Sequence, residues 1–98
     1  MIYADKVTFY SNDENDWTWE TIDQIHLNSD DSSISSGWYD KADVYDFIEN
    51  QYKVIKVDIY PYPKLIGDIS SNYDKFVKSE NDNTASDNLV ELGRNGKK

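Results

Sequence analysis

The residues of this chain that could do chemistry are mainly carboxylates and aromatic rings, since the sequence has 19 acidic residues, no cysteine and one histidine. The lack of cysteine excludes disulfides and thiolate-bound zinc, and a zinc site around His26 would need several carboxylates to complete it. His26 is opposite in strand parity to Ile25 and Leu27, so we expect it at the surface, without a catalytic or metal-binding role. The serines between residues 28 and 37 have no neighbouring base, and the four glycines are scattered. Nucleophilic catalysis and phosphate binding by a glycine-rich loop therefore have no support.

Three short stretches carry the oxygen ligands that calcium prefers, at residues 13–16, 30–31 and 82–87. None of them has the alternating acids, the central glycine and the terminal glutamate of an EF-hand loop. Each stretch is more simply a solvated turn. We therefore expect no metal, no cofactor and no enzymatic activity.

The negative charge of the chain is gathered in one segment. Residues 11–50 contain eleven acidic residues and one basic residue, Lys41, a net charge of −10, whereas residues 1–10 are neutral and residues 51–98 carry +1. A surface of this kind is repelled by phosphate backbones and anionic membranes, and it is attracted to basic protein surfaces. We expect a protein partner with a basic surface, and neither direct nucleic-acid binding nor membrane binding.

Three tryptophans are interleaved with these acids. If they lie beside the acids on the surface, they form an aromatic patch with a charged rim, the composition of a protein-binding hot spot. The alternative is that the rings fill a core that is poor in leucine, and we expect this for at least two of the three. The candidate binding residues are Asp13, Glu14, Asp16, Trp17, Trp19, Glu20, Trp38, Asp40, Asp43, Asp46 and Glu49.

The elements that position these residues are organised around a helix that begins at Asp40. The Asp40 side chain could accept a hydrogen bond from the first turn, and Asp43 places a second negative charge near the positive end of the helix dipole. Apolar residues then recur at three- and four-residue spacing, at Val44, Phe47 and Ile48. Asn50 could end the helix in the left-handed conformation.

The period changes to two after this helix. Ile55, Val57 and Ile59 share one face of a strand predicted from Val54 to Tyr60, which the prolines at 61 and 63 end.

The remaining strands are shorter predictions. Ile2–Tyr10 is rich in β-branched and aromatic residues, with Tyr3, Val7 and Phe9 on one face. Residues 17–27 form the second strand, in which the three-residue step between its two isoleucines, at 22 and 25, indicates a bulge or a strand buried on both faces. Residues 65–69 are a turn or short strand around a glycine, and residues 73–78 are a candidate last strand. Residues 28–37 read as a mobile polar loop with Ile34 as its only apolar anchor.

The element order is therefore β-β-α-β-β, an α+β fold with a small antiparallel sheet and one helix packed on one face. We expect a single domain at residues 1–92 and a flexible C-terminal tail at residues 93–98. The start of the chain has no signal-peptide pattern and no stretch is long enough to span a membrane, so a cytoplasmic location is expected.

Four short motifs follow one another through nearly the whole chain. They are Ile22-Asp23-Gln24-Ile25, then Lys41-Ala42-Asp43-Val44 running to Ile48-Glu49, then Lys78-Ser79, and finally Asp87-Asn88-Leu89-Val90-Glu91-Leu92. In this order they resemble a family of small bacterial and phage domains of unknown function, with a helix K-x-x-V-x-x-x-I-E and a closing D-N-L-x-x-L motif. Ser79 stands where that family has Thr, and Gly93 where it has Pro. The resemblance implies a fold and no activity.

The last motif also has a local physical interpretation. The Asp87 and Asn88 side chains can cap backbone N–H groups, while Leu89 and Leu92 pin the tail onto the core.

The charge pattern leads to two hypotheses of function. The first is a non-enzymatic acidic module that binds a basic surface of a partner protein, in its sharper form a phage or mobile-element mimic of nucleic acid that inhibits a nuclease or regulator. The second is a structural or accessory domain that forms a homo-oligomer through its sheet edges.

Overall fold

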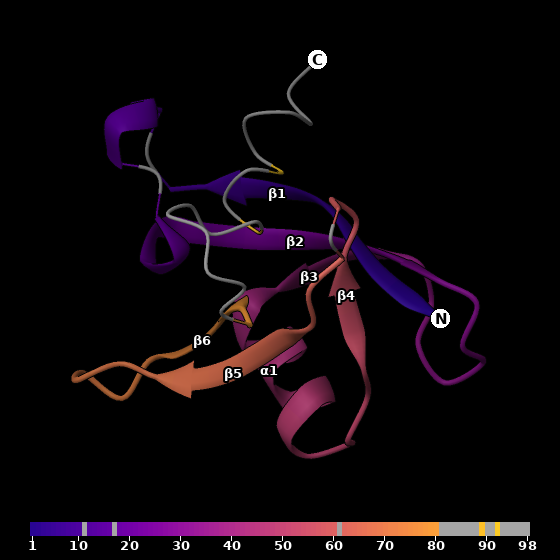
Figure 1. Cartoon of the computed structure of the whole chain (residues 1–98). Coiled ribbons are helices and arrows are strands. Elements are labelled where there is room, and N and C mark those ends of the chain that lie inside the picture. The colour runs from indigo at the N-terminus through magenta and orange to yellow at the C-terminus, as the bar shows by residue number, and fades with distance from the viewer. Residues whose placement is uncertain (11, 17, 61, 81–88, 90–91, 93–98) are drawn as a thin grey trace.

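The structure, a computed structural model, describes residues 1–10, 12–16, 18–60, 62–80, 89 and 92. Within this part the chain forms one α-helix, two short 3₁₀-helices and six strands in two sheets (Figure 1). The α+β class with one packed helix is confirmed. The elements in chain order are β1 (Ile2–Phe9), η1 (Glu14–Asp16), η2 (Trp19–Thr21), β2 (Ile22–Ser29), β3 (Gly37–Asp40), α1 (Lys41–Glu49), β4 (Ile55–Val57), β5 (Leu65–Ile69) and β6 (Lys75–Ser79).

The larger sheet has the strand order β3-β2-β1-β4 and is mixed, because β4 runs parallel to β1 while the other pairs are antiparallel. β5 and β6 form a separate antiparallel hairpin. A bridge between Lys56 and Lys64 joins the two sheets, and the Val57 N–H donates to the Pro63 carbonyl at 2.8 Å. The single antiparallel sheet with the order β-β-α-β-β needs correction in three respects. Strand β4 pairs in parallel with β1, β5 and β6 form a second sheet, and the described part has six strands, with β3 and β5 added to the expected four. Four residues are too few to show a period, so β3 could not be recognised from its pattern.

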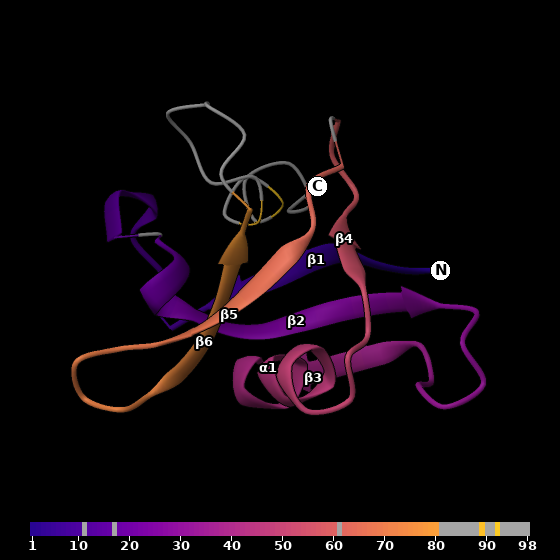
Figure 2. The ribbon, with the colours of Figure 1, turned by 60° about the horizontal axis from the view of Figure 1, so that its bottom comes forward.

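Helix α1 contacts both sheets, through β2 and β3 on one side and through β5 and β6 on the other. Figure 2 shows α1 almost end-on beside β3. Val44 is fully buried, and the Phe47 ring meets Tyr39 edge-on with 5.1 Å between centroids. The hairpin approaches α1 so closely at Gly67 that a Cβ atom there would lie 2.7 Å from the Tyr45 ring and 2.9 Å from Cγ of Glu49.

The helix has the predicted limits, but its ends are built differently. The Asp40 side chain makes no capping bond, and its Oδ1 instead accepts a hydrogen bond from the Gln24 side chain at 3.1 Å. Asn50 is right-handed, with φ of −104°, and its N–H donates to the Asp46 carbonyl. The left-handed conformation occurs at Tyr52, where φ is 55°. The error at Asp40 arises because its partner, Gln24, lies across the sheet and is not visible in the local sequence.

The pairing of β1 with β2 is interrupted twice. Val7 pairs with Ile25 and Phe9 with Ile22, so one extra residue of β2 is accommodated and the predicted bulge is confirmed. A second shift, between Ala4 and Lys6, reverses the parity of β1. Ile2 and Ala4 are buried together with Val7, so the predicted face containing Tyr3 was wrong. Strand β2 begins at Ile22 and not at residue 17, because residues 19–21 form η2.

Strand β4 is shorter than the predicted Val54–Tyr60, but its two apolar residues, Ile55 and Val57, are completely buried as the alternation requires. The core also contains Leu89 and Leu92, and the Leu89 N–H donates to the Ser79 hydroxyl at 2.9 Å. Both leucines therefore pack where the tail was expected to be pinned. The predicted capping by residues 87 and 88 and the tail at 93–98 lie outside the described residues. The helix of the described part is not long and apolar enough to cross a membrane.

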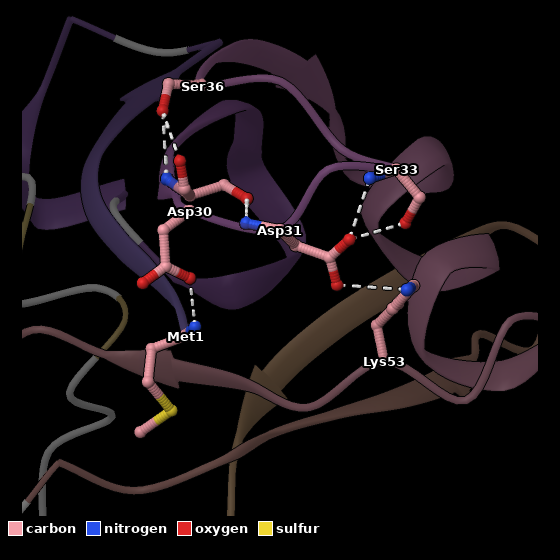
Figure 3. A network of polar contacts seen from close by, with 7 residues as sticks. Met1, Asp30, Asp31, Ser33, Ser36 and Lys53 are labelled. Carbon is pink, nitrogen blue, oxygen red and sulfur yellow. Dashed lines mark hydrogen bonds and ion pairs between the residues drawn. The ribbon is translucent and has the colours of Figure 1, made fainter.

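The polar loop between β2 and β3 is held by a network that Figure 3 shows from close by. Asp31 accepts hydrogen bonds from the Ser33 N–H at 2.8 Å and the Ser33 hydroxyl at 2.6 Å, and it pairs with Lys53 at 3.0 Å. Asp30 pairs with the amino group of Met1. Ile34 is buried, as expected of the apolar anchor of this loop, and the polar contacts add anchors that the sequence did not indicate.

Candidate functional site

An open hollow lies where the end of β1, η2, the start of α1 and the β5–β6 turn meet. We call it the acidic hollow, and its lining residues are Tyr10, Glu20, Asp23, Asp40, Lys41, Ala42, Asp74 and Lys75. A smaller depression adjoins it on the hairpin side and shares Glu20, Lys41 and Asp74 with it. The hollow therefore brings together four carboxylates from different parts of the chain.

Short polar contacts fix the walls of the acidic hollow. The N–H of Tyr10 donates to the Thr21 carbonyl at 2.9 Å, which joins the end of β1 to η2. Thr18 and Thr21 form a capping box around η2, in which the Glu20 N–H donates to the Thr18 hydroxyl. The first residue of α1, Lys41, reaches back, donates to the Glu20 carbonyl at 3.0 Å and lies 5.4 Å above the Tyr10 ring.

The acidic hollow has an excess of negative charge. Its cations are Lys41 and Lys75, and Lys75 also pairs with Asp46 outside the hollow at 3.2 Å. Desolvation and the negative charges of Asp23 and Asp40 raise the pKa of Tyr10 above its usual 10.0. The phenol therefore stays protonated at neutral pH and acts as a hydrogen-bond donor to Asp23.

The structure places the candidate acidic residues on several elements. Glu20 and Asp40 line the acidic hollow, whereas Asp13 and Asp16 lie in or next to η1, and Asp43 is exposed on the first turn of α1. Asp46 pairs with Lys75, and Glu49 lies against the hairpin at Gly67. Trp17 and the side chains of Glu14 and Trp19 lie outside the described part, so the prediction that two tryptophans are in the core stays a prediction for them.

Trp38 is exposed on the face of the larger sheet that points away from α1. Its neighbour in β3, Tyr39, contacts Phe47 of the helix, and successive side chains of a strand point to opposite faces. Trp38 meets His26 edge-on, with 5.2 Å between ring centroids, and His26 Nδ1 is 2.7 Å from an oxygen of Asp5. His26 therefore has a structural partner, and its side chain is 22% exposed.

The chemistry of the hollow is that of carboxylates on an open surface. Among the described residues, no group of three or more His, Cys, Asp or Glu side chains is placed to hold a metal ion. The carboxylates of the hollow stand around an open surface, where a partner's ammonium or guanidinium groups could form charge-assisted hydrogen bonds.

Sequence reasoning missed three contributors to the hollow. Asp23 was counted in the acidic segment but was not selected, and Tyr10 and Asp74 were not considered. Asp74 comes from the β5–β6 turn, 34 positions after Asp40 in the sequence, and no local pattern marks it. Only the packing of the hairpin beside α1 brings it to the site.

No family model matches the chain, and neither a curated protein nor a solved structure matches it. The resemblance to small bacterial and phage domains of unknown function therefore stays a prediction from its four motifs.

Proposed function

We propose that the protein is a non-enzymatic binding module that engages a basic surface of a partner protein through the acidic hollow. The observation that supports the proposal is the convergence of Glu20, Asp23, Asp40 and Asp74 on one open hollow. Carboxylates that gather at one place raise the local concentration of positively charged groups and speed their encounter with the protein.

An interface of this kind depends on electrostatic attraction, so its affinity should depend on salt. Exposed charges are screened over about 10 Å at 0.1 M salt, so binding should weaken clearly as salt rises. A sharper form of the proposal is a phage or mobile-element protein that mimics nucleic acid and occupies the basic groove of a nuclease or regulator. That form predicts competition with DNA or RNA, because both ligands would need the same cationic surface.

The test compares the protein with two variants that carry equal charge changes. The hollow variant is Glu20→Gln, Asp23→Asn and Asp74→Asn, and the control is Asp58→Asn, Asp68→Asn and Glu80→Gln, which lie outside the acidic segment. Each tagged protein is used to capture partners from a nuclease-treated bacterial lysate at low and at moderate salt. We expect a partner that the wild type and the control retain, that salt releases and that the hollow variant loses. Retention by the hollow variant would refute the proposal.

The alternative is a domain that associates with itself through a sheet edge. The observation in its favour is that β3 ends the larger sheet on one side, whereas the outer side of β4 is joined to residues 63–64. It predicts a defined oligomer whose mass does not change with salt. Light scattering that finds a monomer over the accessible range of concentrations would exclude this alternative.

A further inference from the structure

A second feature adjoins the acidic hollow, on the outer face of the larger sheet. We propose that Trp38 and Asp40 form an anchor site for an arginine side chain of the protein partner, with the guanidinium stacked on the indole ring and bonded to the carboxylate. This inference rests on the proposed function, since it names the chemistry that the basic partner presents. Asp40 belongs to both features because it also lines the hollow.

The two residues are aligned by the strand pairing. Trp38 pairs with His26 and Asp40 with Gln24, in adjacent rows of β3 and β2 on the same face. Residues two apart in a strand are separated by about 7 Å, a span that one guanidinium group can bridge. Contacts across both rows hold the side chains, with His26 against Trp38 and the Gln24 amide donating to Asp40 at 3.1 Å.

The site is preorganised and open. The His26 ring is held between Asp5 and Trp38, where it meets the indole at an interplanar angle of 70°, while Trp38 stays 45% exposed. Asp40 binds the Gln24 amide through Oδ1, and no lysine or arginine of the described part pairs with it. The adjacent Lys41 donates instead to the Glu20 carbonyl at 3.0 Å, and Lys6 lies beyond His26 on β1 in the row of Trp38.

Arginine fits this site better than lysine. A planar guanidinium stacks on an aromatic face while its N–H groups, which lie in the same plane, reach a carboxylate beside the ring. The lysine ammonium is a compact and strongly hydrated charge that gains less from an exposed ring. The negative charge of the neighbouring hollow favours a cation of either kind, so the distinctive consequence of Trp38 is a preference for arginine over lysine.

The experiment titrates the whole protein with two peptides, acetyl-Gly-Arg-Gly-Arg-Gly-amide and its lysine counterpart. Binding is followed by NMR through the backbone amide signals of β3 in every protein, and also through the indole N–H of Trp38 where that residue is present. An exposed cation–π contact predicts about two- to fivefold tighter binding of the arginine peptide. Trp38→Leu should remove this preference and leave binding of the lysine peptide unchanged. Asp40→Asn should weaken binding of both peptides. Tyr52→Leu replaces an aromatic ring that is 84% exposed elsewhere and should change neither.

Equal affinity for the two peptides, a preference that survives Trp38→Leu, or the absence of binding at about 1 mM peptide would overturn the inference. A backbone NMR spectrum of each variant verifies that it is folded. The proposed function fails separately. If the hollow variant keeps its captured partner, the function is refuted whatever the peptides do, whereas equal peptide affinities refute only the arginine anchor.

Discussion

The close approach of the β5–β6 hairpin to α1 predicts that Gly67→Ala destabilises the protein. A Cβ atom at this position would lie 2.7 Å from Cδ2 and 2.9 Å from Cε2 of Tyr45, and 2.9 Å from Cγ of Glu49. Ordinary carbon–carbon contacts are about 3.5 Å or longer, so the Tyr45 ring would have to move by nearly 1 Å. The Glu49 side chain is flexible and can move, but the ring is packed against the core.

The expected magnitude follows from two opposing effects. Overpacking of this kind typically costs about 1–3 kcal/mol. Replacing glycine by alanine also reduces the conformational entropy of the unfolded chain, which offsets about 0.4–1 kcal/mol of this cost. We therefore expect the free energy of unfolding to fall by about 1–2 kcal/mol, or the melting temperature by about 4–15 °C for a domain of this size.

Urea denaturation followed by circular dichroism measures this change, and a double-mutant cycle identifies its cause. In a Tyr45→Ala background the ring is gone, so the further change Gly67→Ala should be close to neutral, with a coupling energy of about 1 kcal/mol or more. If Gly67→Ala is as stable as the wild type, or if its cost is unchanged without the Tyr45 ring, then the hairpin does not pack on α1 as described.

Three further predictions concern stability. Hydrogen bonds from Ser33 and the Lys53 ion pair hold the pKa of Asp31 below its ordinary 3.8. Their contribution to the free energy of unfolding is therefore present above pH 3.8 and is lost as the pH falls below it. Asp31→Asn should therefore lower the free energy of unfolding at neutral pH, and this difference from the wild type should disappear in acid. Urea denaturation at several pH values measures it, and a difference that is the same at all pH values would contradict the prediction. Leu89→Ala should cost about 2–5 kcal/mol because Leu89 is completely buried, and a near-neutral effect would mean that the segment around Leu89 is not part of the core. Tyr73 is 88% exposed and has a φ of 65°, a left-handed conformation that asparagine tolerates better than tyrosine. Tyr73→Asn should therefore raise the free energy of unfolding by about 0.5–1 kcal/mol, seen as a higher melting temperature. A lower melting temperature would show that the ring makes stabilising contacts.

The parts of the fold that the sequence predicted are those with a clear local period. The buried stripe of α1 and the burial of Ile55 and Val57 follow from apolar spacing, whereas the limits of α1 were predicted from Asp40 and Asn50. The bulge in β2 follows from the three-residue step between Ile22 and Ile25. Strand β3 has only four residues, so its pairing with β2 has no local signal. The parallel pairing of β4 with β1 depends on where the chain returns after α1, which spacing does not encode.

The candidate site was less predictable because it depends on tertiary packing. Charge segregation selected the part of the chain that supplies Glu20 and Asp40, but the other candidate acids whose side chains the structure describes do not line the hollow. Asp46 is neutralised by Lys75 of the hairpin, and Asp74 of the same hairpin joins the hollow. The β5–β6 hairpin thus pairs one predicted acid, Asp46, with a lysine and supplies another acid, Asp74, that was not predicted. Composition alone cannot anticipate either effect.

The position of Lys41 explains how the fold accommodates so much negative charge at one place. Lys41 is the only basic residue between residues 11 and 50, and it stands in the hollow among the carboxylates. Like charges that share a site repel one another, and a cation among them offsets part of this repulsion in the free protein. Lys41 is also tethered to the Glu20 carbonyl and covers the Tyr10 ring, so it joins η2 and β1 to the start of α1. Because Lys41 and Lys75 together offset only part of the charge of four carboxylates, the hollow keeps a net negative charge while polar contacts fix its walls.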